Sequence, residues 1–400
     1  MRKSMSKPMK KHFIFVTLFL TSAITLGCDF KEVTFDRDFS AAHLDECKQL
    51  SSDNYLLTIR PENTPINDSP WYAFKVSSTD TSQDPSQEKK TINISIKFID
   101  GNRRYLPKMS VDAKNWQAIP YKNNPQNENQ MSFKVEVGAK PILIAGQEII
   151  NNEHYFTWAE NIDKNTELSL SILGESSQGR PILQLTHKTE SKEWLVLTGR
   201  MHPPEITGAL AMLPFVGELV LNKDIGKQFR ERFNILVVPN LNPDGVEHGY
   251  WRHNINGVDL NRDWIKLKQK ETQLVHNKLQ QIVKEGGNIV FAIDFHSTKR
   301  NVFYSMPTDY GAMPALFVEN WLGNLDKQAP DFKVTIKPGN NPGQGVFKQY
   351  IADNYGVHAI TYEMGDNESR NVINSIARVA AKTLMEELMA TNKNQFVNQK

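Results

Sequence analysis

A change in sequence pattern near residue 161 is the feature that most constrains the fold. Beyond it, short apolar runs alternate with segments in which apolar residues recur at i, i+3 and i+4. The first pattern predicts buried strands and the second predicts amphipathic helices. Such alternation is typical of an α/β layer fold with a buried, mixed sheet. The predicted strands are residues 168–173, 182–186, 194–198, 233–239, 289–295 and 359–363, and the predicted helices are residues 206–221, 267–283 and 371–389.

The residues before this change predict a different architecture. Four segments are rich in aromatic and β-branched residues and are separated by turns that contain Asn, Asp, Pro or Gly. This pattern predicts strands and, over the whole region, an all-β, sandwich-like domain. The segments are residues 71–77, 91–99, 132–137 and 154–158.

A chain of 400 residues exceeds what one compact core usually needs, so we expect two domains. The change in pattern places the β domain at residues 28–160 and the α/β domain at residues 161–390. Residues 391–400 are predicted to be a polar, frayed tail.

The first 27 residues have the composition of an export signal. Five basic residues and no acid accompany an apolar run at 13–26, which is too short to span a bilayer. The run ends at Gly27-Cys28 and resembles a bacterial lipoprotein signal, in which the cysteine becomes the lipidated first residue. By that resemblance Asp29 favours retention at the inner membrane. The alternative is a cleaved secretory signal without lipid, and either way we predict a periplasmic or cell-envelope protein.

Cys28 and Cys47 are the two cysteines of the chain. Lipidation of Cys28 would give a membrane anchor and leave Cys47 as a lone thiol. Without lipidation, a disulfide between the two is open in an oxidising compartment. Neither case supplies a set of cysteine ligands for zinc.

The charge balance speaks against a nucleic-acid partner. The formal net charge is +2, but the residues after 27 contain 42 basic and 45 acidic side chains. A nucleic-acid-binding protein normally carries a basic surface. We therefore predict no nucleic-acid partner.

A His-x-x-Glu pattern occurs three times, at residues 43–46, 187–190 and 202–205. This spacing puts an imidazole and a carboxylate one helical turn apart, where both can bind one metal ion. The third copy alone follows an apolar strand and precedes a long apolar helix, and active sites of α/β sheets lie at such crossings. His202 and Glu205 are therefore candidate metal ligands.

His296 is the candidate for a third ligand because it ends another apolar strand. A catalytic zinc ion usually has three protein ligands and one position for water. Taken singly, such a histidine is more often a satisfied residue at the end of a strand.

Six strings together resemble, in order, the zinc carboxypeptidases of family M14, the funnelins, and especially the branch of cytosolic carboxypeptidases. The resemblance covers about residues 165–385, and residues 71–76 and 155–160 are similar to the β domain of that branch. It implies a mixed-sheet zinc-carboxypeptidase fold preceded by an all-β, sandwich-like domain. The strings are HPPE (202–205), NPDGV (242–246), YWR (250–252), DLNRDW (259–264), DFHS (294–297) and TYE (361–363).

The resemblance implies one zinc ion per chain, held by His202, Glu205 and His296. Asp259 matches the acid that orients the first zinc-binding histidine. Glu363 matches the general base that activates the zinc-bound water. Read singly, Asp259 could cap a turn and Glu363 could be an ordinary acid at the end of a strand.

Three further residues match substrate-binding positions. Asn261 and Arg262 match the pair that holds the terminal carboxylate of the substrate, and a planar guanidinium suits that task. Arg252 matches the arginine that stabilises the oxyanion. Each arginine, read alone, could be a surface ion-pair partner.

The implied function is a metallocarboxypeptidase that cleaves the C-terminal peptide or isopeptide bond of a peptide with a free carboxylate. Two alternatives stay open: an amidohydrolase acting on N-acyl amino acids or peptidoglycan stem peptides, and a non-catalytic binding lipoprotein. Many members carry a tyrosine on a loop before the catalytic glutamate, but residues 333–348 contain none, so we assign no catalytic tyrosine. Lys299, Lys348 and Arg370 are available to bind an acidic side chain.

Overall fold

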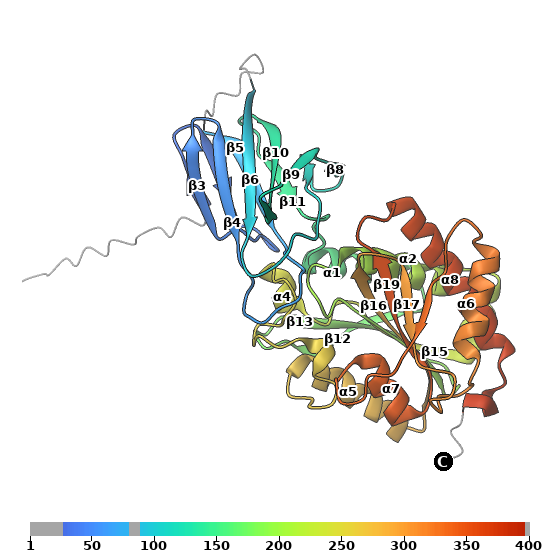
Figure 1. Cartoon of the computed structure of the whole chain (residues 1–400). Helices are drawn as coiled ribbons and strands as arrows, with labels where there is room; N and C mark the ends of the chain where they lie inside the picture. Colours follow the sequence, from blue (N-terminus) through green and yellow to red (C-terminus); the bar gives the residue numbers. More distant parts are fainter. Residues whose placement is uncertain (1–26, 80–88, 397–400) are drawn as a thin grey trace, which may run out of the picture.

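The computed structural model describes residues 27–79 and 89–396, and an eight-stranded mixed sheet forms the centre of the α/β domain (Figure 1). Its strands are β12 (Ser169–Glu175), β13 (Pro181–His187), β14 (Glu193–Gly199), β15 (Phe233–Val238), β16 (Asn288–Thr298), β17 (Val302–Ser305), β18 (Ile336–Pro338) and β19 (Ala359–Gly365). The order across the sheet is β12-β13-β15-β14-β16-β19-β17-β18. β14 pairs in parallel with β15 and β16, and all three are buried along almost their whole length. Continuous apolar strands are expected where helices cover both faces of a parallel sheet.

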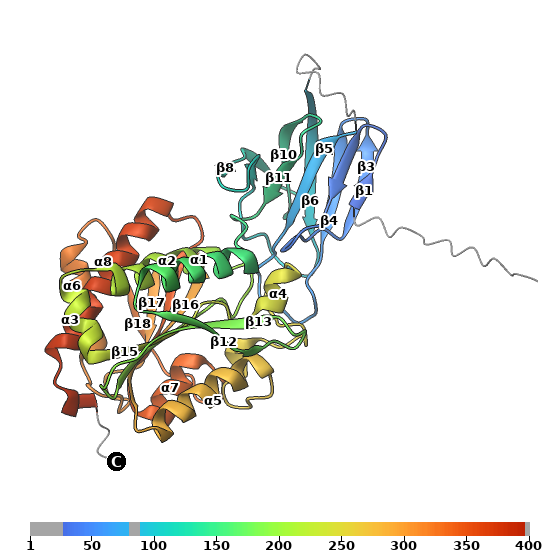
Figure 2. The same ribbon diagram turned by 180° about the vertical axis from the view of Figure 1, so that it is seen from behind.

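Helices cover both faces of this sheet, and each face has its own apolar core (Figures 1 and 2). One face carries α1 (Asn152–Asn165), α2 (Ile206–Leu221), α3 (Ile225–Arg232), α6 (Phe317–Gln328) and α8 (Arg370–Ala390). The other face carries α5 (Lys270–Lys284) and α7 (Phe347–Tyr355). A short helix, α4 (Pro243–Glu247), and the 3₁₀ segments η1 (Leu260–Arg262) and η2 (Lys393–Phe396) complete this domain.

The β domain consists of two sheets that pack face to face around one core (Figure 1). The six-stranded sheet has the order β1-β2-β5-β11-β7-β8, and the five-stranded sheet has the order β3-β4-β6-β10-β9. Phe35 and Tyr55 come from different sheets, and their ring centroids are 5.2 Å apart. The strands are β1 (Gly27–Asp29), β2 (Val33–Asp36), β3 (Glu46–Ser51), β4 (Asn54–Ile59), β5 (Ala73–Ser78), β6 (Lys90–Phe98), β7 (Lys108–Ser110), β8 (Gln117–Ala118), β9 (Tyr121–Asn124), β10 (Asn127–Val137) and β11 (Ile142–Ala145).

The predicted fold class is confirmed, since a mixed α/β domain follows an all-β domain. The predicted helix over residues 206–221 has the bounds of α2. The predicted strand over residues 154–158 is wrong, because these residues lie in α1. Asn151 caps this helix by accepting a hydrogen bond from the backbone of His154, and buried side chains recur with helical spacing at Tyr155, Ala159 and Ile162. α1 therefore crosses the boundary predicted at residue 160 and contacts β12 and β13.

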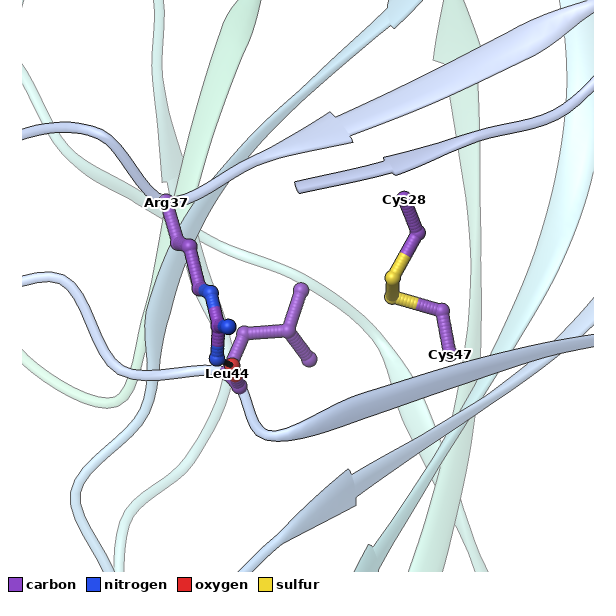
Figure 3. The surroundings of a disulfide bond; sticks show 4 residues. All are labelled: Cys28, Arg37, Leu44 and Cys47. Carbon is purple, nitrogen blue, oxygen red and sulfur yellow. Dashed lines mark hydrogen bonds between the residues drawn. A yellow bond between two sulfur atoms is a disulfide. The ribbon is translucent and has the colours of Figure 1, made fainter. Parts of the chain in front are cut away.

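Cys28 and Cys47 form a disulfide that joins β1 to β3, and so links the two sheets of the β domain (Figure 3). This bond contradicts the predicted lipidation of Cys28 and its lipid anchor, because one sulfur cannot carry both a lipid and a disulfide. The alternative pairing of the two cysteines is the one observed. Residues 1–26 of the predicted signal lie outside the described residues.

The predicted polar tail is wrong for Phe396. This side chain is buried, and its ring centroid is 5.9 Å from that of Phe317. An apolar contact therefore docks η2 onto α6. Within the described residues, no single helix is long and apolar enough to cross a membrane.

Candidate metal centre

The three predicted metal ligands converge at the carboxyl edge of the central sheet. His202 follows β14, Glu205 is the N-cap of α2 and His296 lies on β16. Their ligand atoms all lie within 4.8 Å of one another, and all three residues are buried. Parallel pairing of β14 with β16 brings these chain ends together, with Gly199 opposite Phe295.

A glycine allows the close approach of α2 to the strand that carries His296. A Cβ at Gly208, in the first turn of α2, would lie only 2.4 Å from the backbone oxygen of His296. Since real side chains do not tolerate this distance, a glycine is needed here.

In each histidine, the ring nitrogen that does not face the other metal ligands, Nε2, is hydrogen-bonded to an aspartate. His202 Nε2 donates to Asp259 Oδ1 at 2.9 Å, and His296 Nε2 donates to Asp294 Oδ2 at 2.5 Å. A proton held there leaves the Nδ1 lone pair of each ring free to bind a metal. Asp259 was predicted, whereas Asp294 was missed. Its position two residues before His296 on one strand, and so on the same face, was the available signal.

The donor set fits a zinc ion. The two Nδ1 atoms are 3.1 Å apart, and they lie 3.0 Å and 2.7 Å from the two carboxylate oxygens of Glu205. Burial alone would raise the pKa of Glu205, but the imidazoles of His202 and His296 hold it well below its ordinary value. Two imidazoles and one ionised carboxylate are the ligands that zinc takes in catalytic sites.

Glu363 lies directly beside these ligands, because it is the register partner of His296 in the β16–β19 ladder. Its Oε2 atom is buried and finds no hydrogen-bond donor among the described residues. Burial and the nearby carboxylate of Glu205 raise the pKa of Glu363 to about 8. A divalent cation on the adjoining ligands would favour the ionised form. Glu363 thus offers an unpaired carboxylate oxygen next to the metal site.

Asp259 also gathers the predicted substrate-binding side chains. Its Oδ2 accepts a hydrogen bond of 2.8 Å from Arg252 Nε and lies 4.0 Å from Arg262 Nη1. The side chain of Arg252 is largely buried, whereas that of Arg262 is 46% exposed and accessible to a ligand. Asn261 has its amide nitrogen 3.4 Å from Nε2 of His296. The structure therefore brings all the predicted site residues of the α/β domain to one place.

A loop between β18 and α7 closes against this group. Gly345 has a positive φ of 67°, and a Cβ there would lie 2.4 Å from the backbone oxygen of Arg262. The N–H of Phe347 donates to Asn261 Oδ1 at 2.9 Å. Gly345 thus lets the backbone of this segment contact the predicted carboxylate-binding pair.

The three available basic residues have different surroundings. Arg370 donates hydrogen bonds to Glu148, so its guanidinium is already engaged by a residue at the boundary with the β domain. Lys299 is exposed beside Arg104. Lys348 is buried in the first turn of α7, and this burial lowers its pKa to about 8.

Comparisons with known proteins agree with this geometry. A family model described as zinc carboxypeptidase matches residues 156–386, which is more than half of the chain. Mouse cytosolic carboxypeptidase 6 is 26% identical over 302 residues, covering 68% of this chain and 54% of that protein. Human cytosolic carboxypeptidase 2 is 23% identical over 317 residues, covering 70% and 35% respectively. The chain therefore spans about half the length of the first relative and less of the second.

Solved structures show the same fold over both domains. A metallo-carboxypeptidase from Burkholderia cenocepacia superposes with a TM-score of 0.73 at 18% identity, covering 90% of this chain and 100% of that one. A metallo-carboxypeptidase from Pseudomonas aeruginosa, in complex with (2-guanidinoethylmercapto)succinic acid, gives 0.71 at 19% identity, covering 89% and 99%. At these identities the likeness shows the fold.

Proposed function

The chain belongs to the zinc carboxypeptidase family, and on that premise we propose that it hydrolyses the C-terminal peptide or isopeptide bond of peptides with a free carboxylate. The observation that carries this proposal is the convergence of three buried ligands with a further carboxylate, that of Glu363. His202, Glu205 and His296 offer the metal-binding atoms, and Glu363 presents a buried oxygen that has no hydrogen-bond donor in the described part of the chain.

Glu363 acts as general base and then as general acid in this proposal. A zinc ion held by the three ligands would supply Lewis acidity and would lower the pKa of water to about 7. Glu363 Oε2 accepts the proton of the attacking water and later gives it to the leaving amine. Asp259 and Asp294 keep the histidine tautomers in which Nδ1 is free to bind the metal.

The arginines bind the two charged parts of the substrate. Arg262 is half exposed, and with Asn261 it would hold the terminal carboxylate through a planar, charge-assisted contact. Arg252 would donate to the oxygen that becomes negative during attack on the carbonyl. Asp259 fixes the guanidinium of Arg252 in that position.

We also propose that the protein works outside the cytoplasm. The composition of residues 1–27 is that of an export signal, and the Cys28–Cys47 disulfide is a bond that persists in oxidising compartments. The candidate substrates are then envelope peptides with a free carboxylate, including peptidoglycan stem peptides.

Zinc analysis combined with digestion of a C-terminal peptide library tests the proposal. We expect about one zinc per chain and the release of single C-terminal residues, both measured by mass spectrometry. Cleavage of N-acyl amino acids with intact peptides would instead favour the amidohydrolase. A metal-free, inert protein would leave only a binding function.

A further inference from the structure

A buried carboxylate of the β domain reaches the backbone of the α/β domain close to the candidate site. Glu62 follows β4, and its side chain is 3% exposed. Its Oε2 accepts the N–H of Trp251 at 2.8 Å, and its Oε1 accepts the N–H groups of Arg252 at 3.0 Å and His253 at 2.7 Å. One carboxylate therefore binds three successive backbone groups about 190 residues away in the chain.

These backbone groups depend on Glu62, because residues 251–253 lie in neither a helix nor a strand. Hydrogen bonds to an ionised acceptor are stronger than neutral ones, and a buried N–H without an acceptor is costly. His253 adds a fourth contact, with Nδ1 lying 3.0 Å from Oε1 of Glu62. Burial would raise the pKa of Glu62, but the bonds from His253 and the backbone lower it below its ordinary value. The carboxylate is thus ionised and fully engaged.

The held segment continues directly to the metal ligands. Arg252 donates through Nε to Asp259 Oδ2, and Asp259 Oδ1 holds Nε2 of His202. On the other side, Trp251 packs in the core of the β domain, where a Cβ at Gly101 would lie 2.6 Å from its ring. A shift of this segment by even 1 Å would therefore move the Arg252 guanidinium relative to the metal site.

We propose that Glu62 is a positioning residue for catalysis, which holds residues 251–253 so that Arg252 points at the reacting carbonyl. The inference rests on the proposed function, since it is there that Arg252 receives its role. It gives the β domain a part in the reaction, although no atom of Glu62 touches the metal ligands.

The test compares Glu62→Gln with Glu46→Gln in the full-length zinc enzyme. Glu46→Gln is a matched control, because it removes the same charge from the same domain. The side chain of Glu46 is exposed and pairs only with Arg60 among the described residues. In Glu62→Gln one oxygen becomes an amide group that cannot accept a hydrogen bond from a backbone N–H.

We expect kcat for C-terminal residue release in Glu62→Gln to fall about 10- to 100-fold with KM and zinc content nearly unchanged. Hydrogen exchange of the peptide covering residues 250–254 should be faster. Glu46→Gln should leave all of these values unchanged.

A double-mutant cycle with Arg252→Ala separates positioning from general destabilisation. If Glu62 acts through Arg252, the double variant loses no more kcat than Arg252→Ala alone. Losses that multiply, or an unchanged kcat in Glu62→Gln, would overturn the inference and leave the proposed function standing.

Glu62→Asp provides a second variant if Glu62→Gln does not fold, because it keeps the charge on a shorter side chain. We expect an intermediate kcat at full zinc content, and a wild-type kcat despite faster exchange at 250–254 would overturn the inference. A wild-type protein that binds zinc but is inert toward every peptide would overturn the proposed function, and with it the catalytic role of Glu62.

Discussion

The two domains contribute to the site in different ways. In the α/β domain, strands such as β14 and β16 are buried along almost their whole length, and the metal ligands lie where these strands end. In the β domain, strands such as β6 alternate between buried and partly exposed residues, so each sheet has one inner face. Two residues from loops of this domain, Glu62 and Arg104, approach the site. They bind backbone groups and side chains that surround the metal ligands. Metal-ligand atoms thus come from one domain, and the other domain positions their surroundings.

Arg104 is a second example of such a contact from the β domain. It forms two hydrogen bonds with Asp366, of 2.8 Å and 3.0 Å, and donates to the backbone oxygen of Ser297 at 2.7 Å. The N–H of Ser297 in turn donates to Glu205 Oε2 at 3.1 Å. The pair is almost fully buried, so removing one partner would leave an uncompensated charge. The β domain is therefore linked to the metal ligands through two series of contacts, one that begins at Glu62 and one that begins at Arg104.

The largest expected effect concerns a metal ligand, His296. We expect His296→Ala to lose both bound zinc and peptidase activity, because two protein donors hold the ion far less well than three. Zinc content measured by mass spectrometry checks this outcome. Wild-type protein stripped by a chelator is the control, and added zinc should restore its activity. A full zinc equivalent in the variant would remove His296 from the ligand set.

Glu363→Gln should have the next largest effect. The amide keeps the size of the side chain but cannot accept the proton of water, so kcat should fall about 10²- to 10⁴-fold. Zinc content should stay at the wild-type value, which separates this variant from the ligand variant. Turnover at the wild-type rate would exclude Glu363 as the base. The α/β domain would then supply the metal ligands but not, through this residue, the general base.

The metal site could be predicted from the sequence because its residues lie where periodicity is strongest. His202, His296 and Glu363 lie within three residues of the carboxyl ends of apolar strands, and the bounds of α2 follow from its apolar pattern. Asp294 was missed, although it shares a strand face with His296. For these residues, local pattern and tertiary position agree.

The contribution of the β domain could not be predicted in this way. Glu62 and Arg104 lie in loops, and their partners are far away in the chain, so no local pattern marks them. The wrong strand at residues 154–158 has a related cause. Aromatic residues suggested a strand, but the cap at Asn151 and packing against the sheet favour a helix.

Removing the disulfide tests whether the stability of the whole β domain affects the site, or only the contacts that Glu62 and Arg104 make with it. Cys28 and Cys47 are 19 residues apart, and a loop of this length corresponds to about 3 kcal/mol of stability. We expect Cys28→Ser with Cys47→Ser to lower the denaturant midpoint by a corresponding amount. The kcat of folded protein should not change, because neither cysteine contacts Glu62 or Arg104. A lower kcat under conditions where circular dichroism shows native structure would mean that the whole β domain tunes the site.

Lys348 should give the smallest effect, and one with a defined pH dependence. It is 4% exposed and has no ion-pair partner in the described part of the chain, and burial lowers its pKa to about 8 from 10.5. Below about pH 8 both the folded and the unfolded chain carry its proton, so the cost of burying the charge is fully present. Between about pH 8 and 10.5 the unfolded chain binds more protons, so the free energy of unfolding rises with pH.

A pKa lowered from 10.5 to about 8 corresponds to about 3 kcal/mol, and loss of the hydrogen bond from Lys348 Nζ to the backbone oxygen of Gly339 offsets part of it. Lys348→Met should therefore stabilise the protein by about 2 kcal/mol at pH 7, and this gain should fade as the pH approaches 10.5. Urea unfolding at pH 7 and pH 10 measures the difference, and the exposed Lys227→Met serves as the matched control. Stability gained at pH 7 together with a higher KM would mean that the α/β domain keeps a costly lysine, next in sequence to the Phe347 that contacts Asn261, for the sake of substrate binding. Equal stability of wild type and variant at pH 7 would show that Lys348 is not destabilising.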